Sequence, residues 1–275
     1  MSMDRREFLT ASAIGSLTLG HSVITPGDLL VDTRSPDTQA GAASTAGTRK
    51  ILIAGGGFNT AYIRYMAALS GKKRPRICYL PTASADAEEG IIKFYEHCAP
   101  LDVEAHVQKS FIESLSQHQG WDEVFLSMDG IVVSGGNTLN QQAIWKAQGI
   151  DTVLRHAWDQ GIVLGGASAG SLCWFEEGTT DSRPKALSIV KCMGFLTGSH
   201  SPHYDAEAGR RPLYHKLIGE GTMKPGYACD NDAGIYFEDQ TVKRVVSTRA
   251  GAKVYYVSVV NGAVAEKVHE PEMIA

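Results

Sequence analysis

A serine flanked by small residues is the pattern in this chain best suited to covalent chemistry. It lies in Gly-Ala-Ser-Ala-Gly at residues 166–170, with Ser168 at its centre. The apolar run 162–164 before it is typical of a buried strand, and the apolar stretch 172–175 after it has helical character. Small neighbours permit the strained turn that lifts a serine hydroxyl clear of a sheet. The pattern predicts a nucleophile elbow at Ser168, and the alternative is an ordinary glycine-rich turn from strand to helix.

A second glycine turn could supply a donor to the same place. Gly135-Gly136-Asn137 follows the apolar strand expected over 130–134. If that strand and the one before Ser168 are neighbours, the amides of Gly136 and Ala169 point at a carbonyl oxygen held beside Ser168, as an oxyanion hole requires. We also expect Asn137 to contact the substrate. The alternative is a helix-entry turn that touches no substrate.

A nucleophilic serine needs a base, and histidines follow the elbow at short distance. His203 comes directly after Pro202, whose fixed φ stiffens the loop, and it lies in a polar segment where an imidazole stays accessible. His200 is its competitor, whereas His215 is expected on a helix facing solvent. The 35 residues from Ser168 to His203 are too few for the late acid and histidine of an α/β-hydrolase, so a standard lipase or esterase is disfavoured.

The orienting acid is less constrained by the sequence. Carboxylates near the elbow and the histidine are candidates, and they are Glu176, Glu177, Asp181, Asp205 and Glu207. We favour Asp181, in Thr-Thr-Asp-Ser at residues 179–182, because it is expected in a loop where the chain turns back over the site.

The elements that must position these residues alternate between strand and helix. Strands are expected over 50–54, 76–80, 103–107 and 130–134, and helices over 59–70, 86–98, 121–126 and 139–146. This order predicts an α/β fold with a doubly wound, mostly parallel sheet and a ligand site at the carboxyl ends of the strands. A Rossmann dinucleotide site is disfavoured, because Thr60 stands where the third glycine of the fingerprint belongs. From residue 227 onward, short β-rich runs and the Asn261-Gly262 turn predict an antiparallel extension.

Composition fits one catalytic domain and excludes several other classes. The chain has 275 residues, 43% of them hydrophobic, and a formal charge of -4 without a long basic run, so nucleic acid is not an expected partner. The five cysteines include no C-x-x-C pair, and we expect buried thiols, Cys173 among them, with no metal and no cofactor.

The N-terminus has a different character. Arg5 and Arg6, followed by Phe-Leu and a weakly apolar segment over 10–20, resemble a twin-arginine export signal. The segment 21–48 is rich in Ser, Thr, Pro, Gly and Ala, and is expected to be a disordered linker. We therefore divide the chain into a signal and linker, 1–48, and a single domain, 49–275, and expect an exported or periplasmic protein, with the cytoplasm as the alternative.

Together, the elbow at Ser168, the preceding Gly-Gly-Asn loop and the Pro-His pair resemble the dipeptidase E and cyanophycinase family of serine peptidases. The resemblance covers the chain from about residue 50 to its end, and it implies a fold similar to the class I glutamine amidotransferases. It also implies Ser168 as nucleophile, His203 as base and the amides of Gly136 and Ala169 as the oxyanion hole. The Thr-Thr-Asp match favours Asp181 as the acid, with Asp230 or Asp232 as replacements.

The resemblance implies cleavage after an N-terminal aspartate, so the expected partner is a small peptide. An arginine after the catalytic histidine is expected to hold the substrate carboxylate, and Arg210 and Arg211 stand at that position. A cyanophycinase-like activity on aspartate-linked arginine is an alternative, as is a catalytically silent protein that binds an acidic ligand. A homodimer is an assembly that the sequence allows.

Overall fold

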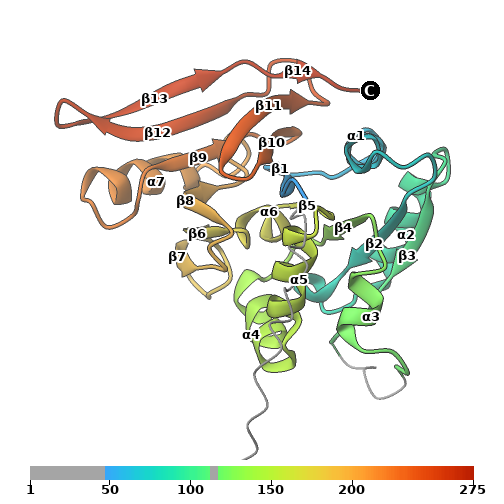
Figure 1. Cartoon of the computed structure of the whole chain (residues 1–275). Helices are drawn as coiled ribbons and strands as arrows, with labels where there is room; N and C mark the ends of the chain where they lie inside the picture. Colours follow the sequence, from blue (N-terminus) through green and yellow to red (C-terminus); the bar gives the residue numbers. More distant parts are fainter. Residues whose placement is uncertain (1–46, 112–116) are drawn as a thin grey trace, which may run out of the picture. The chain divides into compact units, whose positions relative to one another are not determined.

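The computed structural model describes residues 47–111 and 117–275, which lie within one compact unit from Ser44 to Ala275 (Figure 1). The expected export signal and nearly all of the expected linker fall outside these residues. In the two described ranges, no helix has the length and apolar character needed to cross a bilayer.

Strands and helices alternate up to Ser168, as the sequence predicts, except that a further helix over Ile150–Asp159 directly follows the helix that begins at Thr138. These elements are β1 (Lys50–Ala54), α1 (Thr60–Ser70), β2 (Arg76–Leu80), a 3₁₀ turn (Thr82–Ser84), α2 (Glu88–Cys98), β3 (Glu104–Val107), α3 (Trp121–Phe125), β4 (Gly130–Val133), α4 (Thr138–Gln148), α5 (Ile150–Asp159) and β5 (Val163–Ala167). The rest of the chain is rich in strands. It comprises α6 (Ala169–Leu172), β6 (Phe175–Thr180), β7 (Ser188–Lys191), β8 (Leu196–Ser201), α7 (Arg210–Gly219), β9 (Gly226–Cys229), β10 (Ala233–Glu238), β11 (Thr241–Ser247), β12 (Val254–Val260), β13 (Ala263–His269) and β14 (Glu272–Met273).

The larger sheet has eight strands in the order β14-β11-β10-β1-β5-β4-β2-β3. Five neighbouring strands of this sheet, β1-β5-β4-β2-β3, are parallel, because each of them pairs in parallel with the next. The strands β10 and β11 extend it antiparallel beyond β1. This arrangement confirms the predicted mostly parallel α/β sheet with an antiparallel extension, and it places the carboxyl ends of β4 and β5 side by side.

Alternation along β1 shows how the sheet buries both faces. Ile51 and Ile53 pack in one hydrophobic core, and Leu52 and Ala54 pack in the other, because successive side chains of a strand point to opposite faces. Residues of α4 and α5 contribute to the first core, and residues of α1 and α2 contribute to the second. Helices therefore cover both faces, as a doubly wound fold requires.

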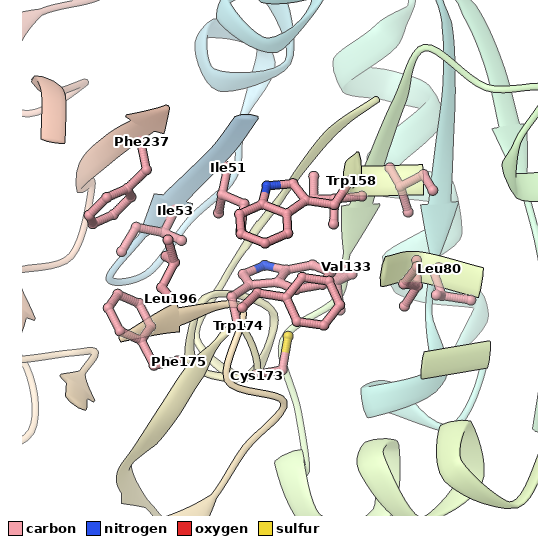
Figure 2. Packing of buried hydrophobic residues seen from close by; sticks show 14 of the residues in the cluster. Ile51, Ile53, Leu80, Val133, Trp158, Cys173, Trp174, Phe175, Leu196 and Phe237 are labelled. Atoms are coloured by element: carbon pink, nitrogen blue, oxygen red, sulfur yellow. The ribbon is translucent and has the colours of Figure 1, made fainter. Parts of the chain in front are cut away.

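Aromatic side chains fill the core directly behind the elbow. Figure 2 shows Trp174 lying among Trp158, Val133 and Cys173. Trp174 and Trp158 each lie 5.3 Å, ring centre to ring centre, from Phe195. Since Trp174 comes six residues after Ser168, this packing anchors the segment that leaves the elbow.

The chain after the elbow departs from the prediction. The helix ends at Leu172, before the end of the helical stretch expected over 172–175, and residues 175–180 form strand β6, which includes positions expected in a loop. Strand β6 belongs to a second sheet of six strands in the order β13-β12-β9-β8-β6-β7, which the sequence analysis did not predict. A short apolar run fits a buried helix and a buried strand equally well, and pairing with β7 and β8 decides for the strand.

Candidate active site

Ser168 forms the sharp turn between β5 and α6, with φ 58° and ψ -118°. The glycines on either side are required by the approach of β4. A Cβ added at Gly166 would lie 2.3 Å from the Val133 carbonyl oxygen, and one added at Gly170 would lie 2.2 Å from the same atom. The spacing Gly-x-Ser-x-Gly therefore lets this strained backbone pack against its neighbouring strand.

His203 meets the serine from the second sheet. It follows the end of β8, and its backbone N–H donates to the Gly55 carbonyl oxygen at 3.3 Å. Its Nε2 lies 2.8 Å from Ser168 Oγ, which is within hydrogen-bonding reach for proton transfer. The structure thus brings together the two residues expected to act as nucleophile and base.

The third member of this chain of hydrogen bonds is Asn231. Its Oδ1 accepts a hydrogen bond from His203 Nδ1 at 2.7 Å. An acceptor at Nδ1 keeps the proton on that nitrogen, so that the lone pair of Nε2 faces the serine hydroxyl. The sequence analysis missed Asn231 because it considered only carboxylates. Its position in the sequence could have identified it, since Asn231 lies between Asp230 and Asp232, which were the alternative candidates for the acid.

The backbone around Asn231 is fixed by charged neighbours. Its N–H donates to Asp205 Oδ1 at 2.8 Å, and its carbonyl oxygen accepts from Arg249 Nη2 at 2.9 Å. Arg249 also donates from Nε to Asp232 Oδ2 at 3.2 Å. A neutral amide therefore contacts the imidazole, while two carboxylates and one guanidinium hold the loop in place.

Asp181 does not orient His203, which corrects the expectation for the acid. Its side chain is 66% exposed and lies 3.7 Å from Arg210 Nη2, at the end of β6. The replacements are also engaged elsewhere, because Asp230 Oδ2 accepts from the Lys253 N–H at 2.9 Å and Asp232 pairs with Arg249. The Nδ1–H of His203 already donates to Asn231 Oδ1.

The other carboxylates considered as the acid have partners of their own. Glu176 pairs with Lys224 and accepts from the Gly198 N–H, and hydrogen bonds from both groups lower its pKa. Glu177 pairs with Lys191 and accepts from the Lys224 N–H at 2.8 Å. Asp205 bonds to Asn231 and Arg249, and Glu207 bonds to Arg210. These contacts hold the second sheet and the Asn231 loop together.

Two glycine amides lie in the turn that follows β4, and Gly135 of this turn is close to Ser168. The N–H groups of Ser134 and Asn137 donate to carbonyl oxygens of Leu80 and Ala83, and those of Gly135 and Gly136 have no partner within the two described ranges. A Cβ added at Gly135 would lie 3.8 Å from Ser168 Oγ, so this glycine is in direct proximity to the serine. Ala169 begins α6, where amide groups lack intrahelical acceptors. The oxyanion hole formed by the amides of Gly136 and Ala169 stays a prediction. The Gly135 amide is added to it as a further candidate donor.

The Asn137 side chain is engaged within the protein. Its Oδ1 accepts from the Asn140 N–H at 3.0 Å and caps α4, and its Nδ2 donates to the Ser182 carbonyl oxygen at 3.1 Å. The side chain expected to touch the substrate therefore connects the oxyanion loop to the segment after β6.

The two arginines expected to hold a substrate carboxylate are occupied within the protein. Arg210 is 2% exposed, and it donates to the Thr179 carbonyl oxygen at 2.6 Å and to Glu207 at 2.7 Å. Arg211 forms a two-pronged pair with Glu266 at 2.9 and 2.7 Å. Burial acts to raise the pKa of Glu266, but hydrogen bonds from Arg211 and its neighbours outweigh burial and lower that pKa to about 2. This placement corrects the expected carboxylate site.

His200, the competing base, is buried and turned away from Ser168. Its Nδ1–H donates to the Tyr227 carbonyl oxygen at 2.9 Å, which leaves Nε2 to accept from the Ser171 hydroxyl at 3.0 Å. Burial lowers the pKa of His200 to about 3, so the ring is neutral at ordinary pH. Its contacts tie the elbow helix to strand β9.

The buried neutral state of His200 predicts a pH-dependent stability. Between about pH 6.5 and pH 3 the unfolded chain binds a proton at His200 that the folded chain does not, so the free energy of unfolding falls as the pH falls. The expected contribution is a slope of up to about 1.4 kcal/mol per pH unit. Urea unfolding from pH 4 to pH 7 measures it. His200→Gln should have a shallower slope than the parent protein, and an unchanged slope would contradict the assignment.

A cavity of about 240 Å³ opens beside Ser168. Its walls come from β2, β4, the elbow and helix α2, and they consist of Gly57, Phe58, Tyr79, Gly90, Lys93, Phe94, His97, Val132, Val133, Ser134, Gly135, Ala167 and Ser168. A larger cavity of about 350 Å³ lies against α4 and α5 and includes none of these residues. The smaller cavity is therefore the candidate substrate pocket.

A serine with an aligned imidazole, set at the carboxyl end of a parallel sheet, is the arrangement of a serine hydrolase. The profile of peptidase family S51 matches residues 51–245, more than two thirds of the chain, and the chain belongs to this family. The uncharacterized peptidase YgaJ of Bacillus subtilis (strain 168) is 43% identical over 224 residues, which cover 78% of this chain and 94% of that protein. The predicted relationship to the dipeptidase E and cyanophycinase family, and the assignment as a hydrolase, are confirmed.

Solved structures show the same fold. A peptidase from an acI-B1 Actinobacterium aligns with a TM-score of 0.62 over 83% of this chain and 96% of that one, at 16% identity. A protein assigned as a peptidase E from Listeria monocytogenes EGD-e aligns with a TM-score of 0.54 over 72% of this chain and 98% of that one, also at 16% identity. Both similarities show that this chain has the same fold as those two proteins.

Proposed function

We propose that this S51 peptidase hydrolyses short peptides through an acyl-enzyme on Ser168, and that its substrates are dipeptides of the Asp-X type. The observation that carries the proposal is the hydrogen-bonded series Ser168–His203–Asn231, with distances of 2.8 and 2.7 Å. A nucleophile, a base and an acceptor that orients the base are the parts that acyl transfer needs.

In the proposed mechanism, His203 Nε2 accepts the proton of Ser168 as Oγ attacks the carbonyl carbon. The amides of Ala169 and the Gly135-Gly136 turn donate to the oxyanion that forms. The C–N bond then breaks, and His203 gives its proton to the leaving amine. In the second half, His203 takes a proton from water, the hydroxide attacks the ester carbon, and the proton returns to Ser168 Oγ. Asn231 accepts from His203 Nδ1–H throughout.

Preference for an acidic substrate is supported by the resemblance and by the charge of the pocket. No Asp or Glu is among the residues that form the walls of the cavity beside Ser168, whereas Lys93 and His97 are. Such a pocket favours an anionic group over a cationic one. The cyanophycinase-like alternative requires recognition of an arginine side chain, for which these walls offer no carboxylate.

The test combines covalent labelling with a substrate panel. A fluorophosphonate should give one adduct on Ser168, located by peptide mass spectrometry, and Asp-Leu should be hydrolysed faster than Leu-Leu. Label on Ser168 without preference for Asp-Leu would refute the specificity and leave the peptidase intact. Absence of both label and hydrolysis would favour a silent binding protein. Rapid hydrolysis of β-aspartyl-arginine would favour the cyanophycinase-like alternative.

We also propose that the leader carrying Arg5 and Arg6 exports the protein. The twin-arginine pair is the feature that such a pathway recognises, and it accepts proteins already folded. Replacing both residues by lysine keeps the charge and removes the pair, so the variant should accumulate in the cytoplasm. Cell fractionation of the full chain in its own host measures this. Equal distribution of parent and variant would contradict export by this route.

A further inference from the structure

Helix α2 presents two basic side chains to the cavity beside Ser168. Lys93 and His97 lie one helical turn apart, and both form part of the cavity wall. Residues four apart share a helix face, so the two side chains are directed to the same side of α2. Neither residue has a role in the hydrogen-bonded series of Ser168, His203 and Asn231.

A buried hydroxyl in the same cavity is weakly satisfied. Ser134 is 2% exposed, its Oγ makes no hydrogen bond of normal length within the described ranges, and the Tyr79 side chain is its polar neighbour. A ligand that accepts a hydrogen bond here would satisfy this hydroxyl better. Ser134 also precedes the glycine turn that lies against Ser168. The hydroxyl therefore indicates a polar ligand group in an otherwise mostly apolar pocket.

The existing partners of the two basic groups are weak. Lys93 Nζ lies 2.6 Å from Glu89 Oε1 in an exposed pair, with Lys93 61% exposed and Glu89 80% exposed. Exposed pairs of this kind contribute little, so Lys93 can turn toward a substrate at small cost. His97 Nδ1 lies 3.3 Å from Thr60 Oγ1, and its contact with the cavity is retained. By contrast, Arg210 and Arg211 are held by buried or two-pronged ion pairs.

We propose that Lys93 and His97 select the acidic side chain of the residue whose carbonyl Ser168 attacks, with the Ser134 hydroxyl as a further donor. This assigns to α2 the role expected of Arg210 and Arg211. It rests on the proposed peptidase function and deepens it, because it names the groups that determine specificity. The carboxylate of the substrate replaces Glu89 as the partner of Lys93.

Exchange of Lys93 for glutamine tests the proposal. The variant should lose about tenfold in kcat/KM for Asp-Leu, because a charged hydrogen bond to the carboxylate is lost, and it should keep its kcat/KM for Leu-Leu.

Three further variants support this comparison. Glu89→Gln removes the carboxylate that competes with the substrate for Lys93, so it should raise kcat/KM for Asp-Leu. Lys216→Gln is the matched control, because Lys216 forms an exposed pair with Glu220 at the same spacing on α7. His97→Gln should show the same direction as Lys93→Gln.

The outcomes separate this inference from the proposed function. If Lys93→Gln leaves the ratio of Asp-Leu to Leu-Leu hydrolysis unchanged while Ser168 is still labelled, the inference is wrong and the peptidase function stands. A parent enzyme that cleaves Leu-Asp in preference to Asp-Leu would overturn the assignment to the acyl side. Loss of labelling on Ser168 in the parent enzyme would overturn both.

Discussion

Replacing Ser168 by alanine will abolish peptide hydrolysis and leave the fold intact. The hydroxyl is the nucleophile of the proposed reaction, and without it no acyl-enzyme forms, so we expect kcat to fall by about 10⁴-fold or more. Alanine keeps the Cβ of serine, and the backbone turn at φ 58° is supported by Gly166 and Gly170 on either side. Hydrolysis of Asp-Leu by purified enzyme measures the loss.

Two comparisons make this result specific. Thermal unfolding of Ser168→Ala should match that of the parent protein within a few °C, since the change removes one hydroxyl and one hydrogen bond to His203. Ser127→Ala changes an exposed serine whose hydroxyl donates to the Val124 carbonyl oxygen, and this variant should retain full activity. Hydrolysis by Ser168→Ala at the parent rate would remove Ser168 from the mechanism.

Replacing Asn231 should have the second largest effect, and the two replacements should differ. Asn231→Ala removes the acceptor for His203 Nδ1–H, so the imidazole loses its fixed tautomer and orientation, and we expect kcat to fall by about 10²-fold or more. Asn231→Asp keeps an acceptor and adds a negative charge, which favours the protonated imidazole. Because the base must be neutral, the low-pH limb of kcat/KM should move to higher pH by about one unit.

The control for Asn231 is the acid that the sequence favoured. Asp181→Asn should leave both kcat and the pH profile close to those of the parent, because Asp181 is exposed and pairs only with Arg210. Full pH–rate profiles from pH 5 to pH 9 distinguish the variants. A large loss in Asp181→Asn together with little loss in Asn231→Ala would restore Asp181 as the orienting residue.

Asn231 also shows where inference from sequence ended. The search for an orienting residue was limited to carboxylates, and it named the residues on both sides of Asn231. An amide oxygen accepts a hydrogen bond as a carboxylate does, and the charge is supplied around it by Asp205, Asp232 and Arg249. The orienting residue was expected to be Asp or Glu, which left out Asn, whereas the segment that contains Asn231 was among those expected to supply it.

What the sequence determined by itself was local. The strands up to Ser168 follow from runs of apolar residues, and the elbow follows from glycines that the close approach of β4 requires at 166 and 170. His203 was identified because Pro202 and a polar loop made it the accessible imidazole. The family could be named because these motifs occur in a fixed order and spacing.

What only the tertiary structure decided was which distant side chains meet. His203 and Asn231 are 28 residues apart, and Arg211 and Glu266 are 55 residues apart. Their contacts depend on the second sheet, whose strands β6, β8 and β9 pair through backbone hydrogen bonds that are the same for every residue type. The sequence therefore specified a serine, a histidine and two arginines, and the packing of the sheet decided that Asn231 would contact His203 and that both arginines would be bound within the protein.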